Sequence, residues 1–209
     1  MIHEMAAPPA EIPVAAGMKG LIFDCDGTLA DTMPIHIAAW CDSFAVRGIS
    51  CPEGFIHTVT GRPAEKIVAI FNRRYHHHID AAAFAVEKNH RARLRLPEAV
   101  PIAPVVEIVR RYRGILPMAV ASGGTRDNVM LTLEVIGLAD FFEAVITADD
   151  PVHPKPDPGI FLEAARRLRV EPSLCQVFED GDAGLEAARR AGMVATDIRP
   201  FVGPAGRGN

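Results

Sequence analysis

The feature that most constrains the fold is an alternation that runs through most of the chain. Short apolar segments that end at a polar or charged residue are separated by longer segments with helical apolar spacing. Strands that alternate with helices predict a parallel, doubly wound α/β sheet. The expected strands are residues 20–23, 117–121, 144–147, 175–178 and 193–196.

Polar side chains follow the strands at one edge of the expected sheet. Asp24 follows the first strand, Ser122 follows the second, and Glu179 and Asp180 follow the fourth. Lys155 lies in the loop after the third strand. Ligands of doubly wound sheets bind outside the carboxyl ends of the strands, so these distant side chains are expected at one site.

Asp24 and Asp26 are the most informative of these residues. In an extended chain, side chains two residues apart point the same way, and Gly27 lets the backbone turn away sharply. Two converging carboxylates suit covalent phosphoryl transfer, with a magnesium ion neutralising the charge that they share with a phosphate. The alternative is a polar turn that caps the next helix. A calcium-binding EF-hand loop is excluded, because its twelfth position requires glutamate and here holds Ile35.

The later segments supply groups that bind phosphate or metal. The hydroxyl of Ser122 and the amides near Gly123 could hold phosphate oxygens, although a plain glycine turn fits the segment equally well. Lys155 lies among three prolines, which stiffen a single positive charge. Glu179 and Asp180 offer carboxylate oxygens to magnesium, or they only cap the next helix.

Taken in order, these motifs resemble those of the haloacid dehalogenase superfamily of phosphatases and phosphomutases. They are Asp24-x-Asp26-Gly27-Thr28, Ser122, Lys155 and Glu179-Asp180, and the resemblance covers nearly the whole chain. The chain is most similar to the β-phosphoglucomutase-like branch and, within it, to bacterial sugar phosphatases such as the fructose-1-phosphate phosphatase. The segments 178–184 and 187–193 carry this closer likeness. The resemblance implies a Rossmann-like core with an inserted helical cap.

The resemblance also implies a role for each motif residue. Asp24 would form an aspartyl-phosphate, and Asp26 would protonate the leaving oxygen and then activate water. Mg²⁺ would be held by Asp24, the carbonyl of Asp26 and Asp180, with Glu179 in support. The residues around the transferring phosphoryl group would be Ser122, Lys155, Gly27, Thr28 and Gly123.

Residues 33–96 interrupt the alternation, because they show helical patterning and no strand. We interpret this segment as the cap, with the connectors 30–33 and 97–104 as its hinge. A cap that closes would exclude water and select the leaving group. The expected domains are a core at 18–32 and 97–200, a cap at 33–96, and loose tails at 1–17 and 201–209.

Four cap residues are expected to contact the substrate. By the resemblance, His36 falls where the mutases carry a histidine that hydrogen-bonds the acid-base aspartate, and the related sugar phosphatases have it too. Arg62 and the pair Lys88-Asn89 resemble the cap loop and helix that contact the sugar and the distal phosphate in the mutases. A charged, solvated helix surface is the alternative, particularly for Arg62.

A magnesium-dependent phosphatase acting on a small sugar phosphate is the expected function, and other classes fit less well. Dehalogenases lack the second aspartate, and a non-catalytic member would lack motif residues, none of which is missing. A β-phosphoglucomutase-type phosphomutase is the main alternative. By the resemblance, however, the mutase's cap arginine falls at Ala64, and its basic residue after the serine motif is replaced by Thr125. Arg62 or Arg126 would have to compensate in gripping a bisphosphate.

Composition limits the partners. The formal net charge of -4 leaves no basic footprint for nucleic acid, and no apolar run approaches the roughly 20 residues of a membrane helix. The first 17 residues lack the basic start and apolar core of a signal peptide. We therefore expect a cytoplasmic protein, a monomer or weak dimer, whose partner is a small phosphorylated metabolite.

The cysteines show no CxxC spacing, and one of them lies between the two aspartates, where a disulfide would interfere. Reduced thiols are therefore expected at Cys25, Cys41, Cys51 and Cys175. The run His76-His77-His78 is expected to be a solvated helix end rather than a metal site.

Overall fold

The computed structural model describes residues 11–59 and 62–202. Its main sheet has five strands, all parallel, in the order β5-β4-β1-β6-β7. The expected α/β class is confirmed, and each expected strand is present with its ends within one residue of the prediction. The strands are β1 (Gly20–Phe23), β4 (Met118–Ala121), β5 (Ala144–Ile146), β6 (Cys175–Glu179) and β7 (Val194–Asp197).

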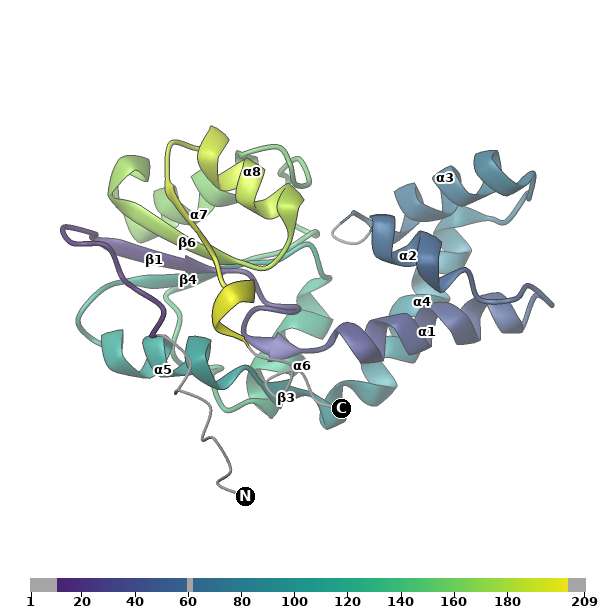
Figure 1. Cartoon of the computed structure of the whole chain (residues 1–209), viewed down its shortest axis with the longest axis horizontal. Helices are drawn as coiled ribbons and strands as arrows, with labels where there is room; N and C mark the ends of the chain where they lie inside the picture. The colour runs from purple at the N-terminus through teal and green to yellow at the C-terminus, as the bar shows by residue number, and fades with distance from the viewer. Residues whose placement is uncertain (1–10, 60–61, 203–209) are drawn as a thin grey trace, which may run out of the picture.

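Helices cover both faces of this sheet (Figure 1). On one face, Leu21 and Phe23 of β1 pack in a cluster with residues of α5 (Ala103–Tyr112) and α6 (Arg126–Val135). On the other face, Ile22 packs with residues of α7 (Gly159–Leu168) and α8 (Asp182–Arg190). A sheet covered on both faces requires strands that are apolar at nearly every position, which is the pattern the sequence shows. The short 3-10 turns η2 (Pro172–Leu174) and η3 (Arg199–Phe201) flank β6 and β7.

The segment between β1 and the rest of the sheet forms helices that stand beside the sheet (Figure 1). Their apolar faces make a cluster of their own, which includes Trp40, Phe44, Phe55, Phe71 and Phe84. The short helix α2 was not expected, because seven residues that include a glycine show little periodicity. The helices are α1 (Met33–Ala45), α2 (Glu53–Val59), α3 (Ala64–Tyr75) and α4 (Ala81–Arg95).

The two connectors between the helical segment and the sheet pair with each other. They form an antiparallel two-stranded ribbon of β2 (Ala30–Asp31) and β3 (Val100–Pro101), the latter following the turn η1 (Leu96–Glu98). This ribbon could not be predicted, because two-residue strands show no alternation of apolar and polar residues. Leu131 of α6 packs against a cluster that includes residues of α1 and α4, so the helical segment contacts the core there.

The prediction of loose tails is wrong for the described parts of both tails. Ile12 is buried, and Gln176 accepts a hydrogen bond from Ala15 N and donates one to Pro13 O, each at 2.8 Å. At the other end, Val202 is buried in the same cluster as Ile12. The buried amide of Gln176 needs polar partners, and the N-terminal segment provides them. Residues 1–10 and 203–209 lie outside the described residues.

The expectation of four reduced cysteines is wrong for one pair. Cys41 and Cys51 form a disulfide, with their Cα atoms 4.7 Å apart. The loop between α1 and α2 turns at Gly48, which has a φ of 66°, and returns Cys51 to the side of α1. Spacing along the chain therefore gave no indication of this approach. Cys25 and Cys175 are free and buried.

Two further expectations concern the histidine run at residues 76–78 and helices that could span a membrane. His76 and His78 are exposed at the end of α3, as expected for a solvated helix end, while the ring of His77 stacks on Phe71 with centroids 5.1 Å apart. Within the described ranges, the helices are too short or too polar to cross a membrane.

Candidate active site

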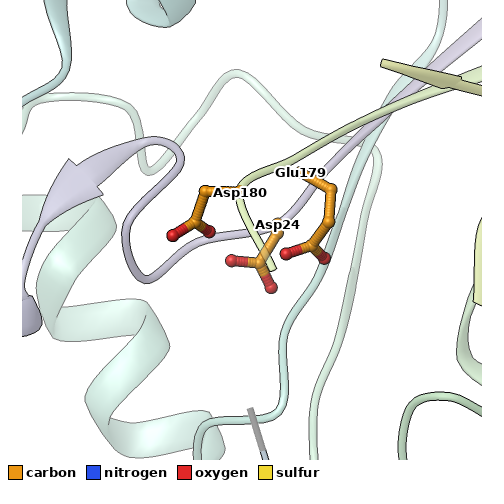
Figure 2. A group of neighbouring side chains, drawn as sticks. All are labelled: Asp24, Glu179 and Asp180. Atoms are coloured by element: carbon orange, nitrogen blue, oxygen red, sulfur yellow. The ribbon is translucent and has the colours of Figure 1, made fainter. Parts of the chain in front are cut away.

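Three carboxylates meet at the carboxyl end of the sheet (Figure 2). Asp24 follows β1, while Glu179 ends β6 and Asp180 comes next. Since Phe23 pairs with Phe178 across β1 and β6, the residues that follow them lie side by side. One oxygen from each of the three acids lies within 4.8 Å of the others. Clustered carboxylate oxygens of this kind are ligands that hard divalent cations prefer.

Lys155 is buried against this acidic cluster. Its Nζ lies 2.6 Å from Asp24 Oδ1 and 2.7 Å from Glu179 Oε2, and 5.0 Å from the centroid of the Phe161 ring. Burial alone would lower the pKa of Lys155, but the carboxylates of Asp24 and Glu179 outweigh it and raise that pKa above its ordinary value. The lysine is therefore a fixed positive charge, as its proline-rich loop predicted.

Burial and repulsion raise the pKa of all three carboxyls. Desolvation raises the pKa of Asp24 to about 6, with Lys155 opposing and Asp180 reinforcing the shift. Desolvation and Glu179 raise the pKa of Asp180 to about 6, and desolvation and Asp24 raise that of Glu179 to about 7. Three carboxyls face one ammonium, so the site carries excess negative charge above neutral pH. A bound divalent cation would neutralise this excess.

Two glycines leave room for the carboxylates. Gly27 has a φ of 87°, and a Cβ added there would collide with the Asp180 carboxylate. A Cβ added at Gly184, in the first turns of α8, would collide with the Glu179 carboxylate. Gly184 was not predicted as a site residue, and its only signal is its position five residues after Glu179 in the motif segment.

Gly184→Ala is expected to destabilise the protein by about 1–3 kcal/mol, because the added methyl group must displace the Glu179 side chain or the first turns of α8. Thermal unfolding with and without Mg²⁺ measures this, and the rise in Tm caused by Mg²⁺ should shrink as well. The matched control is Gly54→Ala, also at a helical glycine, where nothing lies within 4 Å of the added Cβ. Equal stability and equal Mg²⁺ response of Gly184→Ala and the wild type would contradict the expectation.

Asp26 lies beside the acidic cluster but is held by a separate set of polar groups. Its Oδ1 accepts a hydrogen bond from the Thr32 hydroxyl at 2.7 Å and lies 3.1 Å from His36 Nε2, while Ser122 Oγ is 3.5 Å from Oδ2. Burial would raise the pKa of Asp26, but His36, Thr32 and Lys88 outweigh it and hold that pKa well below its ordinary value. Asp26 is therefore an anion in the free protein.

Lys88 reaches the site from α4 and joins the cap helices to Asp26. Its side chain is buried, with Nζ 3.1 Å from His36 Nδ1 and 5.6 Å from the centroid of the Trp40 ring. A charged ammonium can only donate, so His36 Nδ1 accepts and Nε2 donates to Asp26. Burial lowers the pKa of Lys88 to about 8, although the negative charge of Asp26 opposes the shift.

Of the residues expected from the sequence to bind phosphate, Ser122 lies beside Asp26, Gly123 is exposed, and Thr28 contacts Asp180. Ser122 is buried, and its Oγ accepts a hydrogen bond from Gly124 N at 3.0 Å, while Gly123 is exposed at the turn. Thr28 is buried, and its hydroxyl donates to Asp180 Oδ1 at 3.0 Å. In this position the Thr28 hydroxyl orients the Asp180 carboxylate.

The structure brings together the motif residues and two of the four cap residues. Arg62 is exposed in the bend before α3, and Asn89 is half-buried on α4 with its carbonyl 3.4 Å from Asn128 Nδ2. Within the described part of the chain, neither side chain is hydrogen-bonded or ion-paired to the acidic cluster. The role of Thr32 was not predicted, because a threonine just before a helix usually indicates an N-cap. In the structure its side chain makes no cap hydrogen bond and instead donates to Asp26.

Comparison with known proteins agrees with this arrangement. Residues 18–192 match the family model for haloacid dehalogenase-like hydrolases. The fructose-1-phosphate phosphatase YqaB of Escherichia coli (strain K12) is 38% identical over 86% of this chain and 96% of its own. The validoxylamine A 7'-phosphate phosphatase of Streptomyces hygroscopicus subsp. limoneus is 32% identical over 86% of this chain and 85% of its own.

A solved structure shows the same fold. The crystal structure of β-phosphoglucomutase from Clostridium difficile matches with a TM-score of 0.74 at 25% identity, over 85% of this chain and 83% of that chain. The resemblance drawn from the ordered motifs is confirmed by these comparisons.

Proposed function

This chain belongs to the haloacid dehalogenase-like hydrolase family, and on that premise we propose that it is a magnesium-dependent phosphatase acting on a small sugar phosphate or related phosphomonoester. One observation carries the proposal. The carboxylates of Asp24, Glu179 and Asp180 and the ammonium of Lys155 meet at the carboxyl end of the sheet. A nucleophilic carboxylate beside a fixed cation and a candidate metal site is the arrangement that phosphoryl transfer requires.

Asp24 is the proposed nucleophile. Its Oδ would attack the phosphorus atom as the bond from phosphorus to the sugar oxygen breaks, leaving an aspartyl-phosphate. Asp24 faces the buried ammonium of Lys155 at 2.6 Å, and that ammonium can also donate to a phosphoryl oxygen. Ser122, buried between the strand end and Asp26, is the proposed second donor to the phosphoryl group.

Asp26 is the proposed general acid and base. It would give a proton to the leaving sugar oxygen and then take a proton from the water that attacks the aspartyl-phosphate. In the free protein Asp26 is ionised, which is the form required for the second step, so it must take up one proton from solvent as the substrate binds before it can act as the acid in the first step. His36 and Lys88 act as positioning residues, because they fix the Asp26 carboxylate through a chain of hydrogen bonds that begins on the cap helices.

The residues fit a magnesium ion, because the acidic cluster combines clustered oxygen donors with excess negative charge. Asp24, Asp180 and the backbone carbonyl of Asp26 are the proposed ligands, with Glu179 in support. The bound ion would neutralise the charge of the phosphoryl oxygens and of the nucleophile, as phosphoryl transfer requires.

The affinity for Mg²⁺ is expected to rise between pH 5 and pH 8. Asp24 and Asp180 have pKa values near 6 and Glu179 near 7, so these carboxyls must lose protons before they bind a cation. The stability of the protein without Mg²⁺ should depend on pH in the opposite direction. Carboxyls with raised pKa hold more protons in the folded than in the unfolded state, so their contribution to stability falls as the pH rises from their ordinary pKa values near 4 to the raised values of about 6 to 7.

Thermal unfolding at several Mg²⁺ concentrations and pH values measures both trends. Asp180→Asn provides the control, because removing a proposed ligand should weaken the response to Mg²⁺ at every pH. A rise in Tm with Mg²⁺ that is the same at pH 5 and pH 8 would contradict the assignment of these carboxyls as ligands.

The proposed substrate class rests on the names of the relatives, which include phosphatases of fructose 1-phosphate and of validoxylamine A 7'-phosphate. We also propose that the protein acts in the cytoplasm, as a monomer or weak dimer, on a phosphorylated small metabolite. The likeness to β-phosphoglucomutase keeps a phosphomutase as the second candidate.

One contact favours the phosphatase over the mutase. Arg126 could have replaced the missing basic residue after the serine motif, but its guanidinium donates to Asp150 at 2.7 Å and to the carbonyl of Val145 at 3.3 Å. Those contacts hold the arginine at the end of β5. Of the two arginines that would have to compensate, only Arg62 is then left for a second phosphate, and it is exposed in the bend before α3.

The test is phosphate release from a panel of sugar phosphates in the presence of Mg²⁺, with conversion of β-glucose 1-phosphate to glucose 6-phosphate followed in parallel. Release of phosphate supports the phosphatase, and the best substrate identifies its class. Isomerisation that needs a bisphosphate primer and releases no net phosphate would identify a mutase.

A further inference from the structure

The disulfide between Cys41 and Cys51 has no part in the chemistry proposed above. We propose that this pair is a redox modification site, opened by a dithiol and closed by oxidation, whose state sets the position of α2 and thereby the affinity for substrate. The kinetic part of this inference rests on the proposed phosphatase function. The structural part does not.

The pair is the reactive one of the four cysteines because of where it lies. Cys41 on α1 and Cys51 just before α2 are both half-buried, so a small thiol can approach them. Cys25 and Cys175 are both fully buried inside the core. In cytosolic proteins disulfides are usually transient and regulatory or catalytic, so a bond at an accessible position in such a protein is a candidate switch.

The bond ties α1 to Cys51, just before α2, at the end of a loop that is largely exposed. The loop between them has exposed residues at Val46 and Gly48, and one backbone hydrogen bond, from Ile49 N to Phe44 O at 3.1 Å, turns it back toward α1. Pro52 O then accepts the first hydrogen bonds of α2. Once the disulfide opens, α2 is held mainly by its apolar side chains in the cap cluster. These side chains are Phe55, Ile56 and Val59.

Opening the bond should move α2 more than the helices that reach Asp26. The pair α1 and α4 is joined by the ion pair of Arg95 with Asp42 at 2.8 Å, and Lys88 Nζ of α4 lies 3.1 Å from His36 Nδ1 of α1. Neither contact involves α2 or the loop 46–52. The hydrogen-bond chain from α4 through α1 to Asp26 is therefore expected to survive reduction.

The effect should consequently appear in substrate affinity. Helix α2 leads toward Arg62, one of the four cap residues expected from the sequence to contact the substrate, which lies in the bend before α3. The groups proposed for the chemistry, Asp24 and Lys155, lie on the core, and among the described side chains neither is hydrogen-bonded or ion-paired to α2. We expect reduction to raise KM by at least about threefold and to leave kcat within about twofold.

Thiol–disulfide exchange with a dithiol opens the Cys41–Cys51 bond and needs no further reactant. One thiolate of a dithiol attacks one sulfur of the Cys41–Cys51 bond and forms a mixed disulfide, and the second thiol of the reagent then displaces the protein sulfur. Two electrons and two protons pass to the protein, which ends with two thiols, while the reagent leaves as a cyclic disulfide. Oxidised glutathione or another small disulfide reverses the reaction.

The first measurement counts thiols by alkylation and mass spectrometry. Air-oxidised protein that is unfolded without reductant should take up two alkyl groups, and protein first treated with dithiothreitol should take up four. Peptide mapping should place the additional pair on Cys41 and Cys51. Four groups without reductant would show that the bond does not form and would overturn the proposal.

The second measurement compares hydrogen exchange and kinetics of the oxidised and reduced protein. Reduction should raise deuterium uptake over residues 46–59 at least about twofold at short times, with little change in α4. The double variant Cys41→Ser/Cys51→Ser should match the reduced protein and ignore the reductant. Equal exchange over 46–59 in both states would overturn the proposal, and so would a KM equal in both states for a protein that hydrolyses a phosphomonoester. Protein that hydrolyses nothing in either state would instead contradict the proposed function, while the exchange result would still decide the redox site.

Discussion

Asp24→Asn should abolish phosphate release, with kcat lowered by at least about 10⁴-fold. The amide cannot form the aspartyl-phosphate, and removal of a nucleophile leaves only the contribution of binding and charge stabilisation. Release of phosphate from the best sugar phosphate, measured at saturating substrate and Mg²⁺, checks this. Activity within tenfold of the wild type would exclude Asp24 as the nucleophile.

The same variant should remain folded. Asp24 is buried, and its raised pKa means that its ionised form is destabilising above pH 6, so a neutral isostere removes repulsion from the acidic cluster. We expect a Tm at pH 8, without Mg²⁺, at least equal to that of the wild type. Asp182→Asn is the matched control, because the Asp182 side chain is exposed at the start of α8 and pairs with Arg199 at 2.9 Å. Its kcat should stay within about twofold of the wild type.

Lys155→Met is expected to lower the free energy of unfolding by about 3–5 kcal/mol near pH 7.5. The variant leaves two buried carboxylates without their cation, and breaking a buried ion pair from one side costs more than the pair contributes. The loss should be smaller at pH 5, because Asp24 and Glu179 have raised pKa values and can take up protons there. Denaturant unfolding at the two pH values measures this difference.

Activity should fall with the same substitution. Lys155 is a proposed donor to the transferring phosphoryl group, and loss of one such donor costs about 10²- to 10³-fold in kcat. Lys66→Met, at an exposed position of α3, is the control and should change stability by less than about 0.5 kcal/mol. If Lys155→Met were as stable as the wild type at pH 7.5, the buried ion pairs would make no net contribution to the fold.

The core of the fold could be predicted because its signals are local. A strand covered on both faces is apolar throughout, as in residues 20–23, and the polar residue that ends it is visible in the same short segment. Because the strands run parallel, the polar residues that follow them all lie at the carboxyl end of the sheet. Asp24, Glu179 and Asp180 meet there as expected.

The elements that were missed depend on contacts between distant segments. The ribbon of β2 and β3 and the docking of residues 11–17 on Gln176 join segments whose own sequences carry no period. The disulfide was missed for the same reason, because the return of the loop at Gly48 decides it.

The class of the fold, the family and the residues of the acidic site follow from the sequence, since the apolar period and the polar residues at the strand ends lie in consecutive residues. The tertiary structure alone decided how those residues are held. It placed Thr32 on Asp26, placed Gly184 against Glu179 and joined Cys41 to Cys51. The physical reason is that packing distance and desolvation depend on where separate segments come to lie, which no single stretch of chain specifies.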